Sequence, residues 1–247
     1  MSPPDESPSP AAPPPRPPRA GGGLGTREVV LGWCLWLIGS WVLVLGAAGG
    51  IPAAGPTHRW MSFMAAIGVT AVWPALRLSQ EARDRRGRPT DAPLSRGAVL
   101  LDWVALNLVF QAVLWPMAFV GGWSLPQALL LGGTIAAWSL LAGLIVAWGR
   151  AFDRGSARTA AMGGCLAVLL LEPLVLLAAV VARGGGWGGL PDLRLSPLQA
   201  VFAYSGPAAR FAHADPAFAS RVLGVGAAAV LGWVIFLLAG PRGGPGR

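Results

Sequence analysis

The chain has 247 residues, of which 54% are hydrophobic and only 12% are charged, and its mean hydropathy is +0.56. This composition excludes a soluble domain built around one large core and indicates a protein that crosses a membrane several times. The formal charge of +8 comes from 19 basic residues that are all arginine. Because this bias accompanies many Ala, Gly and Pro residues, it is typical of a GC-rich coding sequence and does not indicate a nucleic-acid partner.

The chain begins with a low-complexity segment, residues 1–26, which is rich in proline and glycine. It contains too few bulky apolar residues to form a core, so we expect a disordered tail. Residues 27–240 form the predicted membrane domain, and residues 241–247 form a short second tail.

Six apolar runs follow in chain order, and each is close to the ~20 residues that a helix needs to cross the hydrocarbon core of a bilayer. The predicted fold is therefore all-α, with lipid as the surrounding medium. The spans are expected at about 29–51, 58–76, 97–120, 128–148, 159–182 and 222–238. The first run is longer than the apolar segment of a signal peptide, and we expect it to be retained.

The distribution of arginine predicts the orientation. The residues before the first span (1–28), the loop 77–96, the connection 149–158 and the C-terminal tail together carry fourteen arginines, whereas the other side carries five. Since basic residues accumulate on the cytoplasmic side, both termini are expected there. The cell inner membrane is the expected location.

Glu172 is the most informative single residue, because it lies in the middle of the fifth run and next to Pro173. An ionised side chain at that depth costs at least ~2.5 kcal/mol, so it normally faces protein or water. The proline is expected to kink the helix. Two interpretations stay open: a hydrogen bond that ties Glu172 to a neighbouring helix, or a position on a proton or substrate path.

The third span supplies candidate partners for that carboxylate. Trp103, Asn107 and Gln111 recur every four residues and therefore share one helix face. Since buried polar groups need partners, Asn107 and Gln111 are predicted to hydrogen-bond to Glu172. Asp102 is expected near the cytoplasmic end of the same span, within reach of water.

The long connection 184–220 is too apolar for a free loop. Ser196–Pro197 and Asp215–Pro216 each resemble a helix cap followed by proline, which predicts two short outer helices within 196–220 that lie on the membrane surface. In the last span, Gly224, Ala228 and Gly232 recur every four residues and predict a smooth face for helix packing.

Catalytic signatures are missing from the sequence. It contains no phosphate-binding GxxxxGK[ST] motif, no HExxH motif and no paired His or Cys ligands. We therefore expect no enzyme activity, no cofactor and no metal.

One segment carries a family resemblance. EARDRRGRPTDAPLSRGAVLLDW, beginning at Glu81, is similar to the loop between the second and third spans of permease subunits of type 2 ABC exporters. Ser196-Pro197-Leu198 also resembles a motif that recurs in the outer connection of that family. The matching loop positions are Glu81, Gly87, Pro93, Leu94, Ser95, Arg96 and Leu100.

The resemblance implies a six-span permease with both termini in the cytoplasm, which pairs with a second permease and docks a separate ATPase subunit on the loop. The loop residues expected to contact the ATPase are Glu81, Arg83, Arg85, Arg86, Pro93, Ser95 and Arg96. Two alternatives remain: a membrane scaffold or assembly protein that transports nothing, and a small proton-coupled transporter that uses Glu172.

Overall fold

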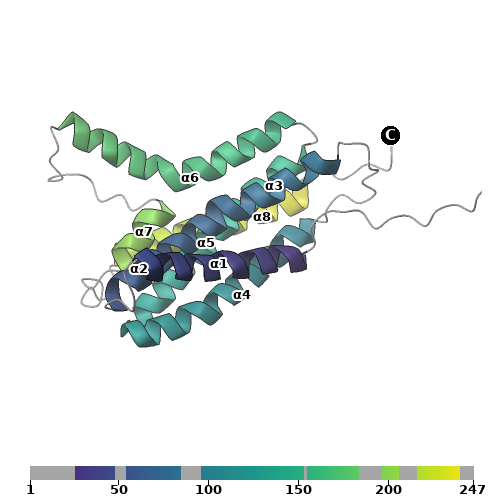
Figure 1. Ribbon diagram of the computed structural model, residues 1–247. Coiled ribbons are helices and arrows are strands. Elements are labelled where there is room, and N and C mark those ends of the chain that lie inside the picture. Colours follow the sequence, from purple (N-terminus) through teal and green to yellow (C-terminus); the bar gives the residue numbers. More distant parts are fainter. Residues whose placement is uncertain are drawn as a thin grey trace, which may run out of the picture.

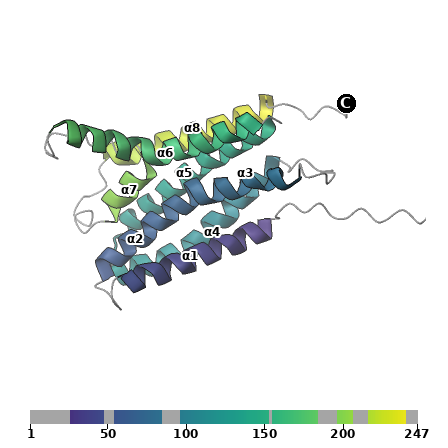
Figure 2. The same ribbon diagram turned by 45° about the horizontal axis from the view of Figure 1, so that its top comes forward.

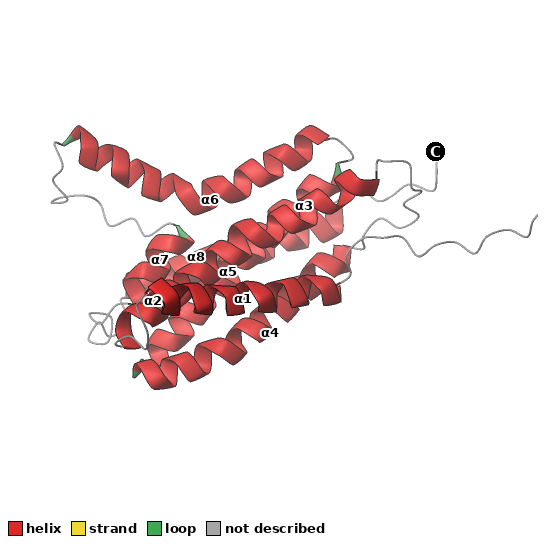
Figure 3. Ribbon diagram, in the orientation of Figure 1, coloured by secondary structure: helices red, strands yellow, loops and turns green. Residues whose placement is uncertain are grey.

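The computed structural model describes residues 26–47, 54–84, 96–152, 155–183, 196–205 and 216–239. Within these residues every regular element is a helix (Figures 1 and 3). The elements are α1 (Thr26–Ala47), α2 (Ala54–Ile67), the π-helix η1 (Gly68–Val72), α3 (Trp73–Asp84), α4 (Arg96–Gly121), α5 (Leu125–Ala151), α6 (Gly155–Ala182), α7 (Pro197–Tyr204) and α8 (Pro216–Ala239). Of the predicted tails 1–26 and 241–247, only Thr26 is described, as the first residue of α1, and the rest lies outside the described residues.

The expected multi-span architecture is confirmed. Five stretches are long and apolar enough to cross a membrane, and the bent α6 makes a sixth if its two halves count as one span. The five are Thr26–Gly46, Thr57–Ser79, Gly97–Gly121, Leu125–Ala151 and Ala219–Leu238. The protein is therefore a multi-pass helical membrane protein.

The helices alternate in direction, so the bundle has two distinct ends (Figure 2). At one end, Arg77 of α3 pairs with Asp102 of α4, and Trp148 near the end of α5 packs on Phe236 near the end of α8. We call this the α3–α4 end. The opposite end, the α7 end, contains the start of α5 and the short helix α7, which packs against α2, α5 and α6. Of the described helices, α1 begins at the α3–α4 end and α8 ends there.

The helix α5 is central, because it packs against α3, α4, α6, α7 and α8. Its contact with α8 is close: a Cβ on Gly232 would overlap the side chain of Leu144. Gly224 and Ala228 are exposed, so the predicted smooth face of α8 meets α5 only at Gly232. Trp233 and Phe236 of α8 are buried, whereas the opposite face presents bulky apolar side chains such as Leu231 and Leu238 to the surroundings.

Two proline-containing spans depart from the regular α-helix. In the second span, Pro74 has no N–H for the carbonyl of Thr70 and its ring would clash with that carbonyl, and the turn just before it widens into η1, where the Trp73 N–H bonds to Gly68 O. In α6 the helix bends by 53° between Leu170 and Glu172, directly before Pro173. The predicted kink is therefore confirmed.

Two boundaries predicted from the sequence are wrong. The helix α3 continues to Asp84, so Arg77 belongs to a span rather than to the loop 77–96. The second predicted short helix is the beginning of α8, which runs without interruption from Pro216 to Ala239. In both places the membrane helix continues past the edge of its apolar run into a polar or proline-bearing stretch.

Candidate functional site

The carboxyl group of Glu172 lies in the bend of α6 and is buried, with 6% of the residue exposed. One of its oxygens, Oε2, accepts a hydrogen bond from the backbone N–H of Ser196. Ser196 is the N-cap of α7, and its own hydroxyl accepts from the Gln199 N–H at 3.2 Å. Glu172 therefore holds the N-terminus of α7, where the helix dipole favours a negative group.

The other oxygen of this carboxyl group, Oε1, is buried and has no hydrogen-bond partner among the described residues. A carboxyl oxygen removed from water without a partner is costly, and such groups are concentrated at functional positions in membrane proteins. Among the described residues, the carboxyl group of Glu172 therefore makes one hydrogen bond, to α7.

A second side chain holds the other end of α7. Gln127, in the first turn of α5, donates from Nε2 to the carbonyl of Tyr204 at 2.6 Å, and its Oε1 is buried without a partner in the described part of the chain. Gln127 itself is 3% exposed. It is placed there because Ser124 caps α5 and Pro126 lies in its first turn. The sequence signal for this placement is Ser-Leu-Pro-Gln, a cap residue followed by proline at the start of α5.

Between these two bonds, α7 is embedded in the bundle. Leu198, Ala200, Val201 and Tyr204 are buried among α2, α5 and α6, whereas Phe202 is half exposed. The guanidinium carbon of Arg59, from α2, lies 4.3 Å from the centre of the Phe202 ring. The Ser196–Pro197 cap predicted from the sequence is confirmed.

Asn107 and Gln111 do not belong to this site, which corrects the predicted pairing with Glu172. Asn107 Nδ2 donates to Trp103 O at 2.8 Å and to Ser139 Oγ of α5 at 3.2 Å. Gln111 lies against Gly132, also on α5. The shared helix face was predicted correctly, but it faces α5, whereas Glu172 faces α7.

A buried ion pair lies at the α3–α4 end. Arg77 and Asp102 are 1% and 0% exposed, and they form two parallel bonds, from Nε to Oδ2 at 2.5 Å and from the second guanidinium nitrogen to Oδ1 at 2.6 Å. This fork geometry is the strongest form of the arginine–carboxylate interaction. The sequence placed Arg77 in a loop and Asp102 near water, so the pair was missed. Arg77 and Asp102 lie at a similar depth in the two spans that flank one loop, and this was the sequence signal that could have revealed the pair.

The predicted ATPase-contacting residues lie beside this ion pair along the chain. Glu81 and Arg83 belong to the last turns of α3, and Arg96 is the first residue of α4. The remaining four, Arg85, Arg86, Pro93 and Ser95, lie outside the described residues.

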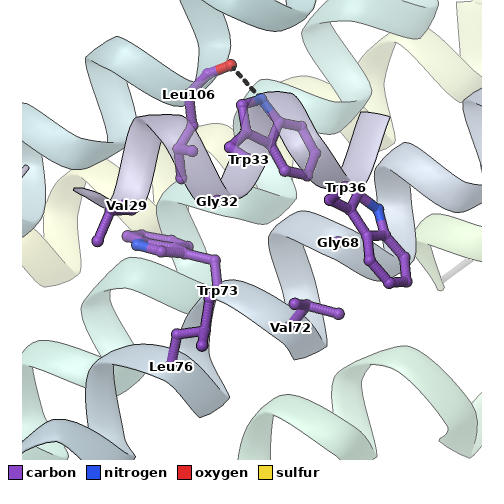
Figure 4. A pocket seen from close by; sticks show the side chains of 9 residues that line it. All are labelled: Val29, Gly32, Trp33, Trp36, Gly68, Val72, Trp73, Leu76 and Leu106. Carbon is purple, nitrogen blue, oxygen red and sulfur yellow. Dashed lines mark hydrogen bonds between the residues drawn. The ribbon is translucent and has the colours of Figure 1, made fainter. Parts of the chain in front are cut away.

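A small crevice opens between α1, the η1–α3 segment and α4 (Figure 4). It is lined by apolar side chains and has a volume of about 10 Å³, which is room for one water molecule. Trp33 is one of the lining residues and donates from Nε1 to Leu106 O at 3.1 Å. A Cβ on Gly68 would lie 2.6 Å from Trp36 Nε1, so glycine is required there. The crevice is a packing feature and is too small for an organic substrate.

No group of three or more metal-binding side chains occurs among the described residues. Comparisons of the chain with models of protein families, with curated proteins and with solved structures found no match. The candidate sites therefore stand on their geometry: the two bonds that hold α7 and the ion pair beside the loop.

Proposed function

We propose that the chain is a permease-like subunit of an ABC exporter in the cell inner membrane, coupled to a separate ATPase through the segment that joins α3 to α4. The observation that carries the proposal is the PLSR motif at 93–96, which leads directly into the membrane helix α4. The arrangement of the helices supports the proposal. This segment joins two spans at the α3–α4 end, where the first span begins and the last span ends.

The ATPase is proposed as a separate subunit because the sequence has no phosphate-binding loop of its own. The translocation path is proposed to form with a second permease, identical or different. The crevice of about 10 Å³ within one chain is too small for an organic substrate. In contrast, α1, α4 and α8 present broad apolar faces on which lipid or another subunit can pack.

Affinity purification of the full chain from its native membrane tests the proposal. We expect a nucleotide-binding subunit to co-purify, and to be lost when Arg85→Glu and Arg86→Glu are introduced together. The matched control, Arg183→Glu with Arg194→Glu, makes the same charge change in the connection before α7 and should retain the subunit. If no ATPase co-purifies, or if the two double variants retain it equally, the exporter proposal is wrong. Co-purification of other membrane enzymes instead of an ATPase would favour the alternative of a membrane scaffold or assembly protein.

A second candidate, a proton-coupled transporter, is favoured by buried Glu172, whose Oε1 has no hydrogen-bond partner in the part of the chain that the structure describes. This function requires an ionisable group, whereas a structural bond from Ser196 needs only an acceptor oxygen. Glu172→Gln keeps the acceptor and removes the ionisation. Loss of proton flux in vesicles at a normal folded yield would support the transporter, and unchanged behaviour would leave Glu172 as a structural tie.

A further inference from the structure

We propose that α7 is a lid that controls the access of water to the carboxyl group of Glu172. The inference does not depend on the exporter proposal, because it concerns only α7 and the two spans that hold it. Two polar side chains from different spans bind the two ends of this helix. Glu172 of α6 accepts a hydrogen bond from the Ser196 N–H, and Gln127 of α5 donates one to Tyr204 O.

The bonds match the chemistry of the helix ends. A carboxylate at the N-terminus and an amide N–H donor at the C-terminus complement the free N–H and C=O groups of a short helix. An isolated eight-residue helix is unstable in water. α7 therefore depends on these bonds and on its buried apolar face, and we expect it to leave its site as a unit.

The same two side chains each keep one buried oxygen without a partner in the described chain, namely Glu172 Oε1 and Gln127 Oε1. A purely structural clamp would gain from satisfying both oxygens. When α7 moves away, both become acceptors for a species with hydrogen-bond donors, such as water or hydronium. The closed helix thus covers two buried acceptor oxygens, one on the side chain that binds each of its ends.

The contact on the exposed side of α7 is weaker. Phe202 is half exposed and lies under Arg59, 4.3 Å from its guanidinium carbon. A cation–π contact at such a site contributes far less than a full apolar side chain in a core. The lid is therefore held firmly at its ends and loosely on its outer surface.

Carbodiimide labelling of Glu172 tests the lid. A water-soluble carbodiimide with a small amine is applied at constant pH to the full chain in nanodiscs, and the modification rate is read by mass spectrometry. Glu172 is the only carboxyl residue between Arg158 and Arg183, so the assignment is unambiguous. Gln127→Leu removes one end bond without touching the labelled group.

We expect Gln127→Leu to raise the labelling rate about three- to fifteenfold, the factor that corresponds to one hydrogen bond between membrane helices. The control is Thr134→Val, which removes a buried hydroxyl on the same helix that bonds to Leu130 O; it should label at the wild-type rate. Equal rates for wild type and Gln127→Leu, or an equal rise in the control, would overturn the lid. If Gln127→Leu does not fold, Phe202→Ala loosens α7 from its exposed side and must raise the rate, or the proposal fails.

Discussion

Breaking the Arg77–Asp102 ion pair should be the most damaging single polar change in the described bundle. Asp102→Leu leaves a guanidinium 1% exposed without its carboxylate. Removing one partner of a buried pair typically costs about 3–5 kcal/mol, because the remaining charge is uncompensated. We expect the free energy of unfolding to fall by about that amount, and Arg77→Met to have a similar effect.

The double variant separates the charge from the packing. Arg77→Met with Asp102→Leu removes both charges and keeps apolar volume, and such replacements are often neutral or stabilising by about 1–4 kcal/mol. Its stability should therefore be close to wild type or higher, far from the sum of the two single changes.

Reversible unfolding in mixed micelles, followed by tryptophan fluorescence, measures all three variants. Arg183→Met, a change at an exposed arginine at the α7 end, is the control and should shift the unfolding free energy by no more than about 0.5 kcal/mol. If the double variant is as unstable as the two single losses added together, the side chains act independently and the ion-pair reasoning is refuted.

Three further outcomes are expected. Gly68→Ala should cost about 1–3 kcal/mol of unfolding free energy, because the new methyl group meets Trp33 and Trp36, whereas a Cβ on Gly39 has open space and Gly39→Ala should be tolerated; equal effects would contradict the packing. Glu172→Gln should retain wild-type stability and Glu172→Leu should lose about 0.6–1.7 kcal/mol in the same unfolding assay, and a Gln variant as unstable as Leu would rule out a role as a simple acceptor for Ser196. Arg86→Cys, with both native cysteines removed, should resist impermeant thiol reagents in intact cells, and labelling from outside would reverse the orientation.

The predictions that succeeded rest on properties of single segments. The length of an apolar run determines which residues cross a bilayer, because each span must satisfy its backbone hydrogen bonds within its own helix. Within the described residues, five spans were located in this way to within a few residues. The bend before Pro173 and the Ser196–Pro197 cap are equally local, since proline lacks an N–H and serine accepts from the following turn.

Tertiary structure alone decided which polar groups meet. Asn107 and Glu172 are both polar groups within spans, and only the rotation of α4 toward α5 and of α6 toward α7 directs them to different partners. Arg77 looks like a loop arginine until α3 continues past the apolar run and brings it to Asp102. One helix's sequence gives the angle between its own side chains, but the partner across an interface depends on how two helices are rotated and shifted against each other. The clamp on α7, from two spans 45 residues apart at Gln127 and Glu172, is therefore a property of the packed bundle.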